Sequence, residues 1–222
     1  DQKLEISLLV TEPPKPKGRG LKIQPNPAHA YAIDHNIPVL SPAKLDKKAI
    51  ENIKDNISKN SVAVGLASAY GKLIPQRVID LFKLGIINIH PSLLPKYRGP
   101  APITSAILNR DKKSGYTIIN IDKGCDTGDI IAQKEVSIKP GDSHNDLKED
   151  IFLELSKDLP GIINNVLTRK VKPSKQNNKL ATYTKKITKE DAQILDTDTT
   201  EQALGKILAY EEWPKTYIII DN

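Results

Sequence analysis

The chain has 222 residues, and its apolar content of 38%, rich in Ile and Leu, is enough to build a buried core. Its 33 Lys and Arg against 27 Asp and Glu give a net charge of +6, which favours an anionic partner. A single Cys excludes a disulfide framework and a cysteine zinc site, and the lack of a long apolar run excludes a membrane helix and a signal peptide, so we expect a cytoplasmic protein.

Apolar runs and helical spacings alternate along the first ninety residues. The runs predict strands at residues 4–10, 37–40, 61–67 and 85–90. The helical spacings predict helices over residues 28–36 and 45–59, and a third helix that begins at Pro75. The run at residues 61–67 is continuously apolar, which is typical of a strand covered on both faces, and residues 85–90 predict another buried strand. The alternation predicts an α/β fold with a Rossmann-like, mostly parallel sheet and flanking helices.

The second half of the chain has longer elements. Two apolar runs, residues 116–122 and 130–138, are close enough in sequence to be antiparallel neighbours. Residues 145–167 predict a long amphipathic helix with an interruption near Pro160. Residues 199–210 predict a last helix, and residues 216–220 predict a last strand.

The composition divides the chain into three expected parts. These are a first domain at residues 1–168, a basic linker without an apolar period at residues 169–197, and the start of a truncated C-terminal domain at residues 198–222. The chain contains no Met and begins with Asp1, so we expect it to be a fragment.

Asn88 and His90 lie two residues apart at the end of a predicted buried strand. Residues at this spacing share a face, and open α/β sheets bind ligands at the carboxyl ends of their strands. Residues 91–102 contain four prolines and predict a stiff loop beside this pair. The pattern favours a binding site, although a structural histidine and a packed connector would also explain it.

A second candidate turn lies at residues 122–129, where two glycines permit a tight turn around Asp126. The turn contains three acids, and spacing alone does not choose among them. Cys125 is a poor nucleophile because acidic neighbours raise the pKa of a thiol. An amide and an imidazolium can stabilise an oxyanion, and a carboxylate can keep an imidazole protonated. Without an activated nucleophile, these groups predict direct acyl transfer to an amine of a bound substrate.

Two stretches resemble the signatures of folate-dependent formyltransferases. They are INIHPSLLPKYRGPAPI at residues 87–103 and DTGDI at residues 126–130. Weaker similarities at residues 17–27, 69–75, 182–187 and 213–214 extend the resemblance to nearly the whole chain, and are closest to the branch that formylates methionyl initiator tRNA. Family members also have a strand before the segment equivalent to Leu4 and an OB-like barrel beyond Asn222, which this sequence does not contain.

The resemblance implies an enzyme with a formyltransferase fold. Its formyl donor would be 10-formyltetrahydrofolate, its acceptor the α-amine of methionyl initiator tRNA in translation initiation, and no metal would take part. We expect a monomer. The implied catalytic residues are Asn88, His90 and Asp126. The implied folate contacts are Ser92, Leu93, Leu94, Pro95, Tyr70 and Gly71.

The same resemblance assigns a nucleic-acid role to four cations near the N-terminus, Lys15, Lys17, Arg19 and Lys22. Composition alone would make them a solvated surface loop, whereas the resemblance favours contact with tRNA phosphates. Two alternatives remain open: an N-formyltransferase that acts on an amino sugar nucleotide, which needs no basic loop, and a non-catalytic RNA-binding remnant.

Overall fold

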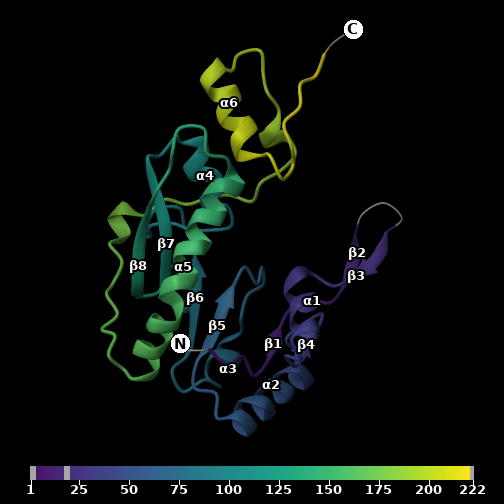
Figure 1. Cartoon of the computed structure of the whole chain (residues 1–222), viewed down its shortest axis with the longest axis vertical. Helices are drawn as coiled ribbons and strands as arrows, with labels where there is room; N and C mark the ends of the chain where they lie inside the picture. Colours follow the sequence, from purple (N-terminus) through teal and green to yellow (C-terminus); the bar gives the residue numbers. More distant parts are fainter. Residues whose placement is uncertain (1–3, 18–20, 221–222) are drawn as a thin grey trace. The chain divides into compact units, whose positions relative to one another are not determined.

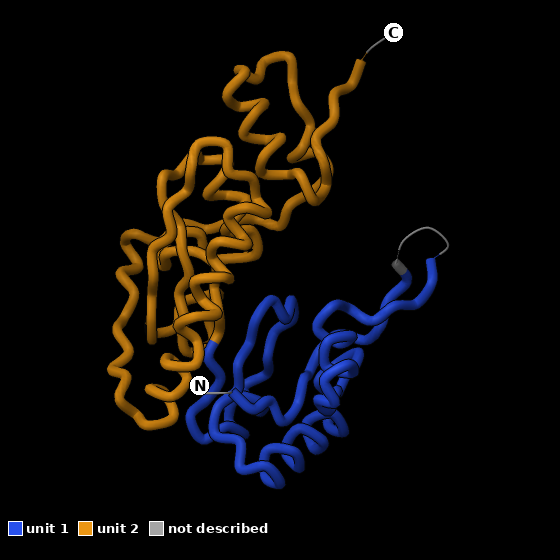
Figure 2. Tube along the Cα trace, in the orientation of Figure 1, with its two compact units in different colours: residues 1–87 blue, residues 88–222 orange. Residues whose placement is uncertain are grey.

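The structure is a computed structural model that describes residues 4–17 and 21–220. Arg19 therefore lies outside the described residues. The chain forms two compact units, Asp1–Ile87 and Asn88–Asn222, which are drawn in different colours in Figure 2. This division differs from the three parts expected from composition, which stay a prediction about domains.

Unit 1 consists of short strands and three helices. In chain order they are β1 (Leu9–Val10), β2 (Lys15–Lys17), β3 (Lys22–Gln24), α1 (Pro27–Asp34), β4 (Val39–Leu40), α2 (Lys47–Asn60), β5 (Gly65–Ser68) and α3 (Gln76–Ile79). β1 pairs in parallel with β4, and β2 forms an antiparallel ribbon with β3. β6 (Ile86–His90) begins in this unit, and the Gly65 N–H at the start of β5 donates to the Gly85 carbonyl just before β6.

Two strand predictions in unit 1 are wrong in extent. The strand expected at residues 4–10 is limited to β1, and Ile6 is 55% exposed. The strand expected to be covered on both faces at residues 61–67 is β5, whose residues alternate between half-buried and exposed. A continuous apolar run is compatible with a strand covered on both faces and with a strand that has one face open to solvent. The run alone does not show how many elements pack against the strand.

Unit 2 contains the end of β6 and the larger elements. They are α4 (Pro102–Leu108), β7 (Lys113–Asn120), β8 (Ile130–Ser137), α5 (His144–Leu167) and α6 (Thr200–Ala209), with short 3-10 turns at Asn178–Leu180 and Glu190–Ala192. β7 and β8 are antiparallel, as predicted, with a register shift at Ile118/Ile119. α5 lies along these two strands, and α6 packs on α4 (Figure 1).

The sequence explains why α5 is long and well anchored. Ser143 and Asp146 form a reciprocal capping box at its start, which satisfies the first amides of the helix. Leu147, Ile151 and Leu155 recur every four residues and are buried. The interruption expected near Pro160 is wrong. The carbonyl of Ser156, which Pro160 leaves without an intrahelical donor, belongs to an exposed residue that water can reach.

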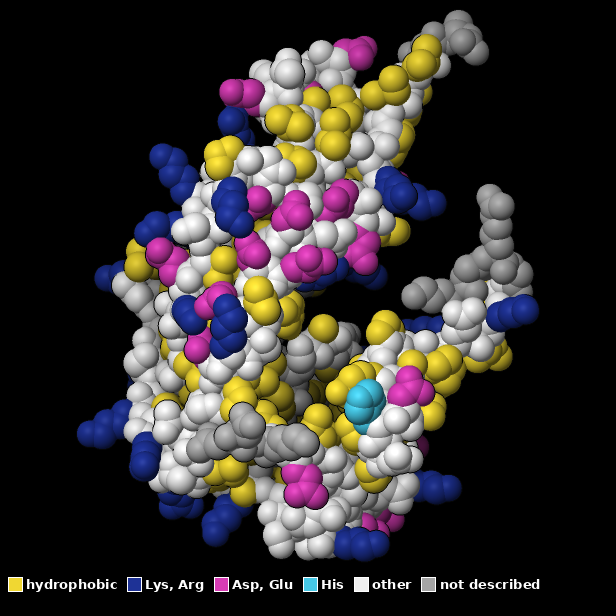
Figure 3. All heavy atoms as spheres, in the orientation of Figure 1, with side chains coloured by type: hydrophobic (Ala, Val, Ile, Leu, Met, Phe, Trp, Pro, Cys, Tyr) yellow, Lys and Arg dark blue, Asp and Glu magenta, His cyan; other side chains and the backbone are white. Residues whose placement is uncertain are grey.

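The C-terminal part of unit 2 confirms one prediction and overturns another. The helix expected at residues 199–210 is α6, capped by Thr199 and Gln202. The strand expected at residues 216–220 is wrong, because only Tyr217 forms a bridge, with Gln193. Figure 3 shows apolar side chains gathered over α6 and the final described residues, and Ile220 is 75% exposed. Among residues 4–17 and 21–220, no sheet covers these side chains.

The buried stripe of α5 should control the stability of unit 2. Leu147→Ala removes a fully buried side chain and should lower the free energy of unfolding by about 2–5 kcal/mol. Leu153→Ala makes the same chemical change on the same helix at a side chain that is 57% exposed, and should cost less than about 1 kcal/mol. Urea unfolding followed by circular dichroism measures both values. Equal losses would contradict the packing described for α5.

Candidate active site

His90 is the buried end of β6. The strand alternates its side chains, so Asn88 lies on the same face, and Asn88 is the half-buried residue of an otherwise buried strand. The His90 Nε2–H donates to the carbonyl oxygen of Tyr97 at 2.8 Å. A carbonyl can only accept, so Nε2 carries a proton and the nitrogen left for proton exchange is Nδ1.

Asp126 is the acid that faces His90. Its Oδ2 lies 3.6 Å from His90 Nδ1 and accepts a hydrogen bond of 2.8 Å from the Gly99 N–H. The backbone of Asp126 has φ 53°, in the left-handed region that non-glycine residues rarely adopt. A strained backbone of this kind persists only where the surroundings hold it, and such residues cluster at functional sites.

In the turn at residues 122–129, called the acidic turn below, the acids make different contacts. Asp122 accepts from the Gly124 N–H at 3.0 Å and from the Thr127 hydroxyl at 2.7 Å, so it holds the turn together. Gly128 is required for a different reason, because a Cβ there would lie 1.7 Å from the Asn120 carbonyl oxygen. The structure therefore brings Asp126 together with His90 and gives Asp122 a local structural contact.

Cys125 is exposed in the acidic turn but poorly suited to nucleophilic attack. Desolvation, and then the neighbouring Asp126 carboxylate, raise the pKa of its thiol. Its thiol also contacts Asp126 Oδ2 at 3.7 Å. A thiol with a raised pKa contains little thiolate near neutral pH, and the thiolate is the reactive form.

The loop at residues 91–102, called the proline loop below, is held by hydrogen bonds of its own buried residues. The Ser92 hydroxyl donates to the Lys96 carbonyl at 2.6 Å, and the Leu94 N–H donates to the Thr117 hydroxyl at 3.0 Å. The Leu94–Pro95 peptide bond is cis. The side chains of Ser92 and Leu94 are buried, whereas Leu93 and Pro95 are half-buried. Of the predicted folate contacts in this loop, Leu93 and Pro95 are therefore the ones with accessible side chains.

Arg98 anchors the other half of the proline loop. It is 1% exposed, and its guanidinium donates to the Gln176 Oε1, the Asn178 Oδ1 and the Tyr183 hydroxyl. These acceptors come from residues 174–184, a segment we call the strap. A buried charge requires such hydrogen bonds, since leaving it unpaired costs about 3–5 kcal/mol.

The strap also holds backbone groups of the two loops. Thr182 and Thr184 bond the proline loop between Pro95 and Ala101. The Gln176 Nε2 donates to the carbonyls of Asp126 and Gly128, at 2.8 Å each. The segment that composition assigned to a basic linker therefore packs onto the site. Sequence reasoning missed Gln176, and the available signal was a cluster of Gln, Asn and Thr, side chains that bond backbone groups.

The remaining predicted site residues lie in unit 1. Tyr70 and Gly71 follow β5, and burial together with the charge of Glu12 raises the pKa of the Tyr70 phenol. Lys15 and Lys17 lie on β2 and Lys22 on β3. Lys15 forms an ion pair with Glu12, whose pKa is lowered mainly by that hydrogen bond. Lys15 is thus partly neutralised within the protein, although both Lys15 and Lys22 are exposed.

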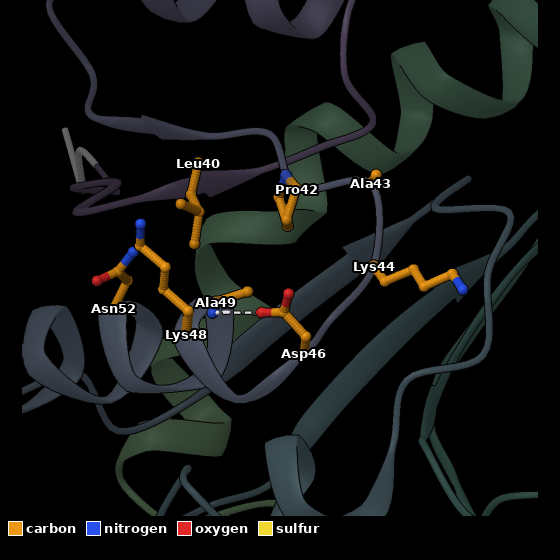
Figure 4. A pocket seen from close by; sticks show the side chains of 8 residues that line it. All are labelled: Leu40, Pro42, Ala43, Lys44, Asp46, Lys48, Ala49 and Asn52. Atoms are coloured by element: carbon orange, nitrogen blue, oxygen red, sulfur yellow. Dashed lines mark hydrogen bonds between the residues drawn. The ribbon is translucent and has the colours of Figure 1, made fainter.

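Unit 1 also contains a hollow of about 390 Å³ between the end of β4 and the start of α2 (Figure 4). A helix N-terminus can bind an anion, but the Asp46 side chain already accepts from the Ala49 N–H at 2.9 Å. This carboxylate occupies the place that an anion would take. The hollow includes none of the predicted site residues.

Comparisons with known proteins show the family of the chain. Residues 1–160 match the model of the formyl transferase family. The chain belongs to the formyl transferase family. It is 36% identical over 209 residues to a methionyl-tRNA formyltransferase from a Sulfurihydrogenibium species, covering 94% of this chain and 67% of that protein. It is 37% identical over 218 residues to one from Kosmotoga olearia, covering 96% and 68%.

Solved structures show the same fold. A 4-N formyltransferase from Francisella tularensis aligns with a TM-score of 0.70 at 26% identity, covering 87% of this chain and 77% of that chain. A sugar N-formyltransferase from a Shewanella species aligns with a TM-score of 0.70 at 19% identity, covering 86% and 75%. Family membership confirms the α/β formyltransferase fold and the enzyme class predicted from the two signatures.

The acidic turn allows a direct test of which acid serves a formyl transferase here. Asp126→Asn keeps the shape of the side chain but removes its charge beside His90, so turnover should fall and the pH–rate profile should be displaced. Asp122→Asn is the matched control, because an amide oxygen can still accept from Gly124 and Thr127. Steady-state kinetics of the two variants measure the difference. A crippled Asp122→Asn with a normal Asp126→Asn would reverse the assignment.

Proposed function

We propose that this chain transfers the formyl group of 10-formyltetrahydrofolate to the α-amine of methionyl initiator tRNA, for translation initiation. One observation carries the proposal: methionyl-tRNA formyltransferases are 33–37% identical to the chain over 94–98% of its length. Sugar N-formyltransferases with solved structures share the fold at 19% and 24% identity, which supports the amino sugar alternative less well.

The groups in unit 2 suit an acyl transfer. Negative charge develops on the formyl oxygen when an amine attacks, and the Asn88 amide and the His90 ring are placed on one strand face to stabilise it. Because His90 Nε2 is engaged by Tyr97, we assign proton exchange to Nδ1, beside Asp126. The Asp126 carboxylate would stabilise the protonated ring and accept the proton that the amine loses, directly or through water. That proton would pass to N10 of the donor as the bond between N10 and the formyl carbon breaks, which releases tetrahydrofolate.

The same groups fit a folate donor. The donor supplies an activated formyl group, so the protein need not provide a nucleophile, in agreement with the raised pKa of Cys125. The half-buried Leu93 and Pro95 offer an apolar, stiff surface beside His90, which suits a flat aromatic ring system. Tyr70 and Gly71 stay predicted contacts on the pterin side.

A tRNA acceptor would account for the four cations at residues 15–22, which we call the basic ribbon after the paired strands β2 and β3. Lys17, Arg19 and Lys22 carry the cations for tRNA phosphates in this proposal, while Lys15 contributes less because Glu12 pairs with it. We further propose a monomer acting in the cytoplasm. No helix among residues 4–17 and 21–220 combines the length and apolar character of a membrane span.

Formylation assays with purified protein test the proposal. Methionyl initiator tRNA with 10-formyltetrahydrofolate should give formylmethionyl-tRNA at a rate proportional to enzyme. An amino sugar nucleotide offered in parallel should not be formylated. Transfer to the sugar alone would support the alternative function, and no transfer to either acceptor would support the RNA-binding remnant.

His90 should carry much of the rate. His90→Ala removes the ring that faces both Asp126 and the expected formyl oxygen, so kcat should fall by on the order of a hundredfold or more. Folate binding, measured by fluorescence quenching, should be retained because the proline loop is held by Thr117 and the strap. Near-normal turnover would remove His90 from the mechanism.

The basic ribbon should affect tRNA and not folate. Lys17→Ala with Arg19→Ala should raise KM for charged tRNA and reduce the slope of log KM against log salt by about 1–2, since each lost phosphate contact lowers the counterion release. Lys47→Ala with Lys54→Ala removes the same charge from α2 and is the control. Equal effects of the two pairs would show that only net charge matters, and a loss with a minimal amine acceptor would place the ribbon in the fold or the chemistry.

A further inference from the structure

One side chain of the strap, Gln176, bonds both to the charged group of Arg98 and to the acidic turn. The Oε1 of Gln176 accepts from Arg98 Nε at 3.1 Å and from the second guanidinium nitrogen at 2.6 Å. The Nε2 of the same amide donates to the carbonyls of Asp126 and Gly128. All four of these hydrogen bonds are made to the proline loop and the acidic turn, and none of them is made to His90.

These bonds bear on the orientation of Asp126. Its left-handed backbone is costly, on the order of 1–3 kcal/mol, and must be held by its surroundings. The two bonds from Gln176 fix the peptide groups that follow Asp126 and Gly128, and the Gly99 N–H fixes the carboxylate itself. The backbone bonds set the position from which the Asp126 carboxylate reaches His90 Nδ1.

We propose that Gln176 is a positioning residue for formyl transfer, which acts by holding Asp126 in register with His90. This inference rests on the proposed function. Arg98 is its support: it fixes the amide so that Nε2 points toward the acidic turn, because both guanidinium bonds engage the opposite atom, Oε1.

The test compares two variants that place the same new charge beside Arg98. Gln176→Glu keeps an acceptor for the guanidinium but loses both donors to the acidic turn. Asn178→Asp also keeps its acceptor for Arg98, and the Asn178 side chain makes no hydrogen bond to the acidic turn. Gln176→Glu should lower kcat by about tenfold to a hundredfold, as a displacement of about 1 Å can do. Asn178→Asp should remain within about twofold.

Two further readouts separate positioning from a purely structural role. In an Asp126→Asn background, Gln176→Glu should add less than about a twofold loss, because its route to the chemistry has been removed. The Gly99 amide, which bonds Asp126 Oδ2, should exchange with deuterium faster in Gln176→Glu and normally in Asn178→Asp. This exchange measurement needs no activity, so it stands even if the tRNA substrate is wrong.

The outcomes are distinct. Additive losses in the double variant, equal losses in Asn178→Asp, an unchanged Gly99 amide, or a Gln176→Glu protein that does not fold would each overturn the positioning role. A wild-type protein that formylates neither acceptor, with a faster Gly99 amide in Gln176→Glu, would instead overturn the proposed function while leaving the hold of Gln176 on Asp126 intact.

Discussion

The buried guanidinium of Arg98 is the constraint around which unit 2 is arranged. A charge that is 1% exposed must be surrounded by acceptors, and the acceptors in the structure are two amide oxygens and a phenol oxygen of the strap. The three side chains must therefore all lie around the Arg98 guanidinium. The proline loop, the strap and, through Gln176, the acidic turn are held together by this requirement.

Neutral acceptors have an advantage at this position. The charge of the guanidinium already acts on the acidic turn, where it lowers the pKa of Cys125 against the larger effects of burial and Asp126. The amides of Gln176 and Asn178 satisfy the geometry without adding charge. The negative charge next to His90 then comes from Asp126.

The sequence predicted those parts of the fold that have a regular apolar period. β6, β7, β8, α5 and α6 follow from such periods, and the Asn88/His90 pair follows from the strand alternation. The strap has no period, because it is held by hydrogen bonds from side chains to distant backbone groups, so its packing could not be predicted. The helix also continues through Pro160, contrary to the local rule, and the carbonyl left without a donor belongs to the exposed Ser156.

The choice of Asp126 shows the same limit at the site. Spacing left three acids in one turn, and the left-handed backbone that turns Asp126 toward His90 is set by Gly99 and Gln176, which are 27 and 50 residues away. The resemblance to formyltransferases named the residue, whereas the contacts give a physical reason for it. Two of the predicted folate contacts, Ser92 and Leu94, have buried side chains. The Ser92 hydroxyl donates a hydrogen bond within the proline loop.

The position of the strap in the sequence affects when the site can be completed during synthesis. Thr182 bonds Tyr97 across 85 residues, and Gln176 bonds Asp126 across 50. A chain grows from its N-terminus, so β6, the proline loop and the acidic turn leave the ribosome well before the residues that hold them. During that interval Arg98 lacks its acceptors in the strap. The hydrogen bonds that hold the proline loop and the acidic turn together can therefore form only after the segment that follows α5 has been released.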